Sequence, residues 1–242
     1  MLNRKITLDE VDSTNNYLKL NRGELPDGTL VTARIQTAGK GRRGHEWLAD
    51  QGMLPLSLLL KQPPHPDTLT LCAGVAVCEA LEPLLPGEDF GIKWPNDIIL
   101  RGHKLCGILC ESVCFGSSMD IVCGIGVNLA QTAKFFEKAN IPHGGSVEML
   151  TGVTINDRDK LAEDIAERLY SYSRSGFESV REKYVKRCLT VGKKIRIIEN
   201  GSEREAFAEG IAPNGFLICS DESGRFEVNS GEVSVRGLLD YI

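Results

Sequence analysis

Glycines and cations are interleaved between Gly39 and Trp47, in the stretch GKGRRGHEW. The glycines follow the G-x-G-x-x-G spacing of a dinucleotide-binding turn, which requires a helix directly after it whose N-terminus meets the pyrophosphate. The residues that follow, HEWLADQGM, have no apolar helical face, and the next apolar stretch ends in lysine and prolines where an acidic residue is expected. We therefore reject the dinucleotide fold and predict a flexible loop whose amides and cations surround an anion.

A loop of this kind suits a reaction between two anions. When a carboxylate is joined to the α-phosphate of ATP, like charges about 4 Å apart repel by about 4 kcal/mol at an effective dielectric constant of about 20. Lysine and arginine side chains beside both groups offset the repulsion and stabilise charge that develops in the transition state. A closed loop also keeps water from a reactive acyl-adenylate. A solvated basic loop would have the same composition, so this stretch alone does not decide the function.

Two further stretches can bring charged groups to the same place. KWPNDI puts Lys93, Asn96 and Asp97 at the exit of a strand, around a proline turn. Asp97 could bind magnesium, which prefers carboxylate and phosphate oxygens, although a capped turn would look the same. HKLCGIL carries Lys104 off a turn and back along a strand, a position where an isolated lysine is usually solvated. The three stretches in this order are far less expected by chance than any one of them.

The elements that must position these stretches follow from the hydrophobic spacing. Asp12, Ser13 and Thr14 form a helix N-cap before NNYLKL, and Pro95 ends a short strand. Leu161, Ile165 and Leu169 mark one face of a helix. The predicted strands cover residues 5–11, 28–36, 53–61, 90–94, 97–100, 104–115 and 120–130, and the predicted helices cover residues 15–20, 67–85, a segment around 161–169 and a segment that runs to about 188.

The character of the chain changes after Thr190. Short strands are then separated by Asn200-Gly201, Asn214-Gly215 and Ser223-Gly224, all of which are hairpin-turn signals. About fifty residues of this kind predict a small antiparallel barrel. We therefore divide the chain into a catalytic domain over residues 1–188 and a small β domain over residues 189–242.

Composition narrows the partners and the compartment. The net charge is −5 and the pI is about 5.5, which argues against a general affinity for nucleic acid or anionic membranes. The first residues lack the apolar region of a secretory signal, and the run MLPLSLLL is too short to span a bilayer. Eight cysteines without a C-x-x-C pair indicate a reducing cytoplasm. Cys106, Cys110 and Cys114 share one strand face, where we expect small hydrophobes of the core instead of metal ligands.

The chain resembles the biotin–protein ligases throughout its length, in the motifs DSTN, QTAGKGRRGHEW, KWPNDI, KLCGILCE and GIGVNL. The resemblance implies an α+β fold, with a mixed sheet and helices like those of class II aminoacyl-tRNA synthetases, followed by a small SH3-like barrel. It also implies an ATP-dependent enzyme that makes biotinyl-5′-adenylate from biotin and ATP. That enzyme then transfers biotin to a lysine of a biotin carboxyl carrier domain of a carboxylase.

The resemblance also assigns roles to residues, with biotin, ATP and magnesium as the bound species. Lys104 would bridge the biotin carboxylate and the α-phosphate, and it would be catalytic together with Arg42 and Asp97, the magnesium ligand. Ser13, Thr14 and Gln36 would meet the ureido ring. The positions that match biotin-binding residues are Ser13, Thr14, Asn15, Gln36, Gly39, Lys40, Arg42, Lys104, Gly107 and Gly124. The positions that match ATP-binding residues are Arg42, Arg43, His45, Trp47, Asn96, Lys104 and Asn128.

Two departures and two alternatives accompany this interpretation. Many bacterial members have arginine at the positions of Lys40 and His45, so the grip on phosphate at His45 should depend on pH. A lipoate–protein ligase shares the fold and the lysine but lacks the GRRGHEW loop and the terminal barrel, while a non-catalytic biotin sensor could have lost Lys104, Arg42 and Asp97.

The pattern begins within ten residues of Met1, so we expect the monofunctional form, which does not bind DNA. An exposed strand edge could pair two chains or dock the carrier.

Overall fold

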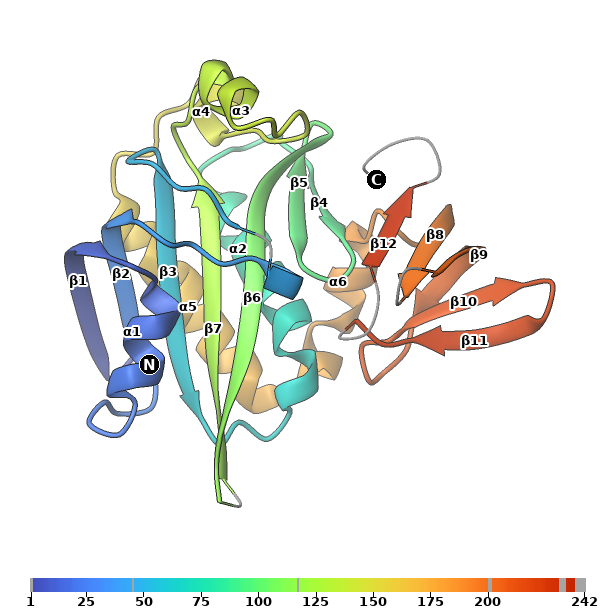
Figure 1. Ribbon diagram of the computed structural model, residues 1–242, viewed down its shortest axis with the longest axis horizontal. Helices are drawn as coiled ribbons and strands as arrows, with labels where there is room; N and C mark the ends of the chain where they lie inside the picture. The colour runs from blue at the N-terminus through green and yellow to red at the C-terminus, as the bar shows by residue number, and fades with distance from the viewer. Residues whose placement is uncertain (1, 45, 117, 200–201, 231–233, 238–242) are drawn as a thin grey trace.

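The computed structural model describes residues 2–44, 46–116, 118–199, 202–230 and 234–237. A seven-stranded mixed sheet with helices is followed by a separate five-stranded antiparallel sheet, which confirms the predicted α+β fold class (Figure 1). The first sheet has the order β1-β2-β3-β7-β6-β5-β4, and among its described strand pairs only β1–β2 is parallel. Its strands are β1 (Arg4–Val11), β2 (Thr29–Gln36), β3 (Met53–Lys61), β4 (Phe90–Lys93), β5 (Asp97–Leu100), β6 (His103–Phe115) and β7 (Ser118–Asn128).

Helices cover both faces of this sheet. In Figure 1, α1 lies in front of the sheet, whereas α2 and α5 lie behind it. Antiparallel register places Gly107 opposite Gly126 and Leu109 opposite Gly124 on the face of α1, and it places Ile108 opposite Ile125 on the face of α2. The helices are α1 (Thr14–Asn21), α2 (Leu69–Leu81), α3 (Ala133–Lys138), α4 (Val147–Thr151), α5 (Arg158–Ser175) and α6 (Arg181–Arg187), with short 3₁₀ turns at Arg42–Gly44, Pro66–Thr68 and Phe177–Ser179. Within the described residues, none of the helices is long and apolar enough to cross a bilayer.

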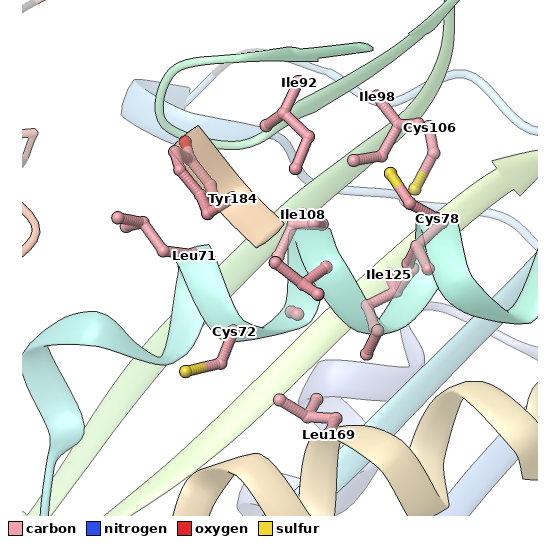
Figure 2. Close-up of a cluster of buried hydrophobic side chains, with 14 of the residues drawn as sticks. Leu71, Cys72, Cys78, Ile92, Ile98, Cys106, Ile108, Ile125, Leu169 and Tyr184 are labelled. Atoms are coloured by element: carbon pink, nitrogen blue, oxygen red, sulfur yellow. The ribbon is translucent and has the colours of Figure 1, made fainter. Parts of the chain in front are cut away.

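The main core lies between the sheet and the pair α2 and α5. Figure 2 shows Cys78 of α2 beside Cys106 and Ile98 of the sheet, with Leu169 of α5 on the other side of α2. Burial raises the pKa of the Cys78 thiol to about 12, so this group stays protonated and packs as an apolar side chain.

The cysteine prediction holds for part of β6 only. Cys106 is buried, Cys110 is half-buried and Cys114 is exposed, and all three are free thiols. Cys114 pairs with Met119 close to the tip of the β6–β7 hairpin. Alternation along a strand keeps the three on one face, but that face meets the core only along the part of the strand that α2 covers. The expectation that Cys114 is a core residue is therefore wrong.

Two helix predictions are corrected in detail. The helix predicted over residues 67–85 is an α-helix only over Leu69–Leu81. A 3₁₀ turn at Pro66–Thr68 precedes it, and the helix ends just before Pro83, which has no N–H with which to continue the hydrogen-bond ladder. Helix α1 does begin after Ser13, which has the extended backbone of an N-cap residue, but the Ser13 side chain makes no capping hydrogen bond. Its hydroxyl therefore remains available for another partner.

The five-stranded sheet has the order β11-β10-β9-β8-β12 among the described residues. Two of the predicted turns join its strands, around Gly215 and between Asp221 and Gly224, while Asn200-Gly201 lies outside the described residues. The Trp94 indole donates a hydrogen bond of 3.1 Å to the Gly215 carbonyl of this sheet. The same core cluster continues from the large sheet into the small one. The strands are β8 (Lys194–Glu199), β9 (Ser202–Ile211), β10 (Leu217–Asp221), β11 (Gly224–Val228) and β12 (Ser234–Gly237).

Candidate functional site

A cavity of about 550 Å³ lies on the α1 face of the large sheet. The sequence motifs supply much of its wall, since α1, the glycine loop, the strand exits of KWPNDI and the glycines of β6 and β7 all contribute. Gly39 and Arg43 were also predicted but do not line the cavity, and His45 lies outside the described residues. The predicted residues that line it are Ser13, Thr14, Asn15, Gln36, Lys40, Arg42, Trp47, Asn96, Asp97, Lys104, Gly107, Gly124 and Asn128.

Lys104 and Asp97 form an ion pair in the cavity wall. The Lys104 Nζ lies 2.7 Å from Asp97 Oδ1, with 22% of the lysine side chain and 11% of the aspartate side chain exposed. The Lys104 main-chain N–H donates to the His143 carbonyl, and its ammonium lies 5.0 Å from the centre of the Trp47 ring. Strand β6, which begins at His103, thus holds Lys104 at the cavity, where the ammonium can reach a ligand without moving its backbone.

Arg42 connects the glycine loop to two other parts of the molecule. Its guanidinium donates 3.0 Å to Asn96 Oδ1 and also donates to the Ser230 carbonyl that follows the small sheet's strand β11. Burial lowers the pKa of Arg42 below its usual value, while the nearby Asp97 carboxylate opposes that change. An arginine stays charged at neutral pH nonetheless. The chain therefore places two fixed cations, Arg42 and Lys104, on one cavity from distant segments.

The glycine loop closes on itself as a short hairpin. The backbones of Lys40 and Glu46 form an isolated antiparallel β-bridge. The Trp47 N–H donates a hydrogen bond of 3.0 Å to the Gly39 carbonyl. A Cβ at Gly39 would lie 2.2 Å from the Trp47 carbonyl oxygen, so this closure requires glycine. Arg43 is exposed and has a left-handed backbone with φ of 57°. The loop supplies Lys40, Arg42 and Trp47 to the cavity and leaves Arg43 outside it.

Glycines form the floor of the cavity. Gly107 and Gly126 are opposite one another on β6 and β7, and the Trp47 ring lies on both of them. A Cβ would approach Trp47 to 2.8 Å at Gly107 and to 2.5 Å at Gly126, and a Cβ at Gly124 would lie 2.3 Å from Asn15 Oδ1. Side chains at these positions would fill the space, so the floor is flat because it is made of main chain.

Polar side chains gather at the α1 end of the cavity. Ser13, Thr14 and Asn15 are nearly inaccessible, with exposed fractions of 3–4%. The Thr14 main-chain N–H donates 3.1 Å to Gln36 Oε1. Ser57 of β3 was not predicted, yet its hydroxyl lies 2.7 Å from Thr14 Oγ1 and 2.6 Å from Asn15 Oδ1. An apolar floor with several polar groups at one end is typical of a small-molecule site.

The Asn128 side chain hydrogen-bonds to neighbouring groups of the protein. Its amide nitrogen donates 3.1 Å to the Gly145 carbonyl, and its Oδ1 accepts 3.0 Å from Gln131. In this arrangement the side chain holds the segment after β7 against the start of β6, where the Lys104 carbonyl accepts from the Gly145 N–H. Asn128 thus lines the cavity while it fixes the loop beside it.

Sequence reasoning missed one whole wall of the cavity. Residues from α3 and the loop after it form that wall. KWPNDI contributes Trp94 to the cavity in addition to Lys93, Asn96 and Asp97, which the sequence had indicated. The alternation in GIGVNL indicates Gly126 as clearly as Gly124, so that position could have been found. The α3 wall carries no comparable signal, since its lining residues are Phe135, Phe136, Asn140, Ile141, Pro142, His143 and Gly144.

The donor set does not fit a resident metal ion. Across the part of the chain that the structure describes, no group of three or more His, Cys, Asp or Glu residues could hold a metal. The predicted magnesium ligand, Asp97, contacts the Lys104 ammonium. Magnesium is usually bound through one or two carboxylates together with substrate phosphates, so any such ion here depends on the phosphates of a ligand.

The sequence matches a known protein family and its curated members. The model of the Biotin/lipoate A/B protein ligase family matches residues 8–128. The chain is 35% identical over 243 residues to the biotin--[acetyl-CoA-carboxylase] ligase of Paracoccus denitrificans, covering 95% of this chain and 100% of that protein. It is 30% identical over 238 residues to the bifunctional ligase/repressor BirA of Salmonella typhimurium, covering 95% of this chain and 73% of that protein.

The fold matches a solved structure over nearly its whole length. The biotin protein ligase from Aquifex aeolicus, in complex with biotin and ATP, superimposes with a TM-score of 0.82 at 29% identity. The match covers 98% of this chain and 100% of that one, and therefore includes both sheets.

Proposed function

Because the chain belongs to the Biotin/lipoate A/B protein ligase family, we propose that its cavity joins biotin to ATP and then passes biotin to a protein lysine. The observation that carries this proposal is the convergence of Lys104 and Arg42 on one glycine-floored cavity. Two cations beside a cavity with a glycine floor suit an acid with a negative head and an apolar tail. The similar ligases from Paracoccus and Aquifex, the second of which was solved with biotin and ATP, support the choice of substrates.

In the first step the biotin carboxylate attacks the α-phosphorus of ATP, and pyrophosphate leaves. In this proposal the Lys104 ammonium contacts both the carboxylate and the α-phosphate, and Arg42 approaches them from the glycine loop; both residues line the cavity. Both charges are held in place before the reaction, so they stabilise the developing negative charge without reorganisation. Trp47, Asn96 and Asn128 line the cavity and complete the proposed ATP site. Arg43, which lies outside the cavity, would join that site only through phosphates that extend beyond it, and the role of His45 stays a prediction from the sequence. Magnesium would arrive with the ATP phosphates near Asp97.

In the second step the amine of a carrier lysine attacks the acyl carbon of biotinyl-adenylate, and AMP leaves. The amine must lose a proton, and Asp97 is the carboxylate beside Lys104 in the cavity wall that we propose as its acceptor. The acceptor lysine would belong to a biotin carboxyl carrier domain of a carboxylase. Residues 1–188 would carry out both steps.

The decisive experiment is transfer to a carrier. The protein would be incubated with biotin, ATP, magnesium and a biotin carboxyl carrier domain, and the carrier would be weighed by mass spectrometry. We expect a mass gain of one biotinyl group that requires ATP. A gain with lipoate but not with biotin would move the chain to the lipoate branch of the family. No gain with either acid, in a protein that binds biotin, would indicate a sensor.

The glycine floor provides a test of where biotin lies. Replacing Gly124 by alanine would put a Cβ 2.3 Å from Asn15 Oδ1, so Asn15 or the strand must shift. We expect the Kd for biotin to rise by about 10- to 100-fold, the range of a few kcal/mol for a disturbed buried polar group.

Calorimetric titration of biotin measures this Kd, and Gly23→Ala is the matched control. Gly23 has no atom within 4 Å of an added Cβ, so its replacement should leave the Kd unchanged. Unchanged biotin binding by the Gly124 variant would place the ligand elsewhere.

A further inference from the structure

A continuous chain of polar contacts runs from the surface of α1 to the cavity. The Lys19 Nζ lies 2.7 Å from one oxygen of Glu111, and Asn15 Nδ2 donates 2.7 Å to the other. Asn15 Oδ1 then meets the Ser57 hydroxyl at 2.6 Å, and that hydroxyl meets Thr14 Oγ1 at 2.7 Å. Glu111 closes the motif KLCGILCE, but the proposed chemistry gives it no role.

The number of protons available fixes the direction in which the hydrogen bonds in this series of contacts are donated. An ionised carboxylate only accepts, so Asn15 must turn its NH₂ group towards Glu111 and towards the Leu109 carbonyl at 3.3 Å. Asn15 Oδ1 therefore faces Ser57 and must accept. A serine hydroxyl has one proton, which goes to Asn15, so the contact of 2.7 Å between Ser57 and Thr14 requires the Thr14 hydroxyl to donate.

The direction decides what the cavity offers a ligand. With its proton directed at Ser57, Thr14 Oγ1 keeps both lone pairs, and Gln36 Oε1, which accepts from the Thr14 N–H, keeps one. These two oxygens lie 3.2 Å apart, and a ligand N–H that reaches them would satisfy both. If the hydrogen bonds ran in the reverse direction, the Thr14 hydroxyl would donate to Gln36 and accept from Ser57. Most of the lone pairs on these two oxygens would then be occupied, and few would remain to accept from a ligand.

We propose that Glu111 is a positioning residue that sets the direction of this hydrogen-bond chain and so makes the polar end of the cavity select a ring bearing N–H donors. The inference rests on the proposed function, because biotin has a cyclic urea with N–H groups and lipoate has a dithiolane ring with none. A site built to hydrogen-bond such a group discriminates strongly against analogues that lack it.

The charge on Glu111 is secure at neutral pH. Burial favours a higher pKa, but hydrogen bonds from Lys19 and Asn15 and the charge of Lys19 outweigh it, and the pKa is lowered from its usual 4.5. A neutral amide at this position would instead be free to donate to Asn15. The Asn15 amide could then flip, and the chain could run the other way.

The test combines a single change with an exchanged pair. Glu111→Gln should raise the Kd for biotin by about tenfold, or about 1.4 kcal/mol, while the KM for ATP stays within about twofold. Asn15→Asp combined with Glu111→Gln restores the direction, because the introduced glutamine amide can donate to the new carboxylate and accept from Lys19. We expect this double variant to recover part of the biotin affinity lost in Glu111→Gln, since Asn15→Asp also gives up the donor to the Leu109 carbonyl. Calorimetric titration of biotin and ATP-dependent pyrophosphate release measure the two quantities.

The control is Lys19→Gln, which keeps a donor to Glu111 and leaves the carboxylate in place, so its Kd for biotin should stay close to that of the wild type. Thermal unfolding of each variant separates a loss of folding from a loss of affinity. Wild-type affinity in Glu111→Gln, or no recovery in a folded double variant, would overturn the inference. A wild-type protein that releases no pyrophosphate with biotin would instead overturn the proposed function.

Discussion

Lys104→Ala should abolish adenylate formation in a protein that remains folded. The Lys104 ammonium lies in the cavity wall, 2.7 Å from Asp97, and in the proposed reaction it is the charge that can contact both the carboxylate and the α-phosphate. Removing one pre-positioned group of this kind lowers kcat by about 10²–10³-fold. The loss should be larger here, because Lys104 would counter the repulsion between the reactants as well as the charge of the transition state.

Biotin-dependent pyrophosphate release measures this effect, and two further variants make the result interpretable. Lys104→Ala combined with Asp97→Asn removes both charges of the ion pair, and it should be as inactive as the single variant. Lys160→Ala removes an exposed ion pair of 2.8 Å to Asp164 and should be fully active. Normal pyrophosphate release by Lys104→Ala would refute the role that we assign to Lys104.

Arg42→Ala should produce the second large loss. The guanidinium contacts Asn96 and the Ser230 carbonyl at the same time, so it both carries charge to the cavity and holds the glycine loop against two other segments. We expect kcat/KM for ATP to fall by about 10²–10³-fold. Arg42→Lys should recover only part of the loss, because an ammonium is a point charge that lacks the planar fork of donors.

The matched control is Arg34→Ala, since Arg34 is exposed and its ion pair with Asp9 spans 3.5 Å. That variant should keep wild-type kcat/KM. Full recovery in Arg42→Lys would show that charge alone is needed and that the fork contacts to Asn96 and Ser230 are dispensable. Wild-type activity in Arg42→Ala would remove Arg42 from the proposed site.

Local sequence patterns were sufficient to predict the strands of the large sheet and to locate the residues that the motifs contain. The alternation of GIGVNL put glycines on one face of β7, and the turn before Lys104 put that lysine at the start of β6, as the register shows. The absence of an apolar helical face after Gly44 correctly excluded the dinucleotide fold, since only a short 3₁₀ turn spans Arg42–Gly44. These features depend on neighbours within a few residues in the sequence.

The features that were missed depend on contacts between distant segments. In the sequence, Ser57 looks like any other buried residue of an alternating strand. Only its position opposite Gly124 in the sheet brings it to Thr14 and Asn15. Cys114 follows the same parity as Cys106, but the extent of α2 decides which of them is covered. Arg42 and Ser230, which are in contact, are separated by most of the length of the chain. The spacing of hydrophobic residues along the sequence cannot indicate such a contact.

The small sheet meets the large one through main-chain acceptors. Trp94 donates to the Gly215 carbonyl and Arg42 donates to the Ser230 carbonyl, so neither contact depends on which side chain stands at the accepting position. Insertions or deletions in those two turns would shift the carbonyls, whereas substitutions that preserve the backbone would leave them in place. A chimera that exchanges the small sheet between related ligases should therefore preserve loop lengths there and keep glycine at Gly215, whose φ is 83°, while the other residues of the two loops can vary.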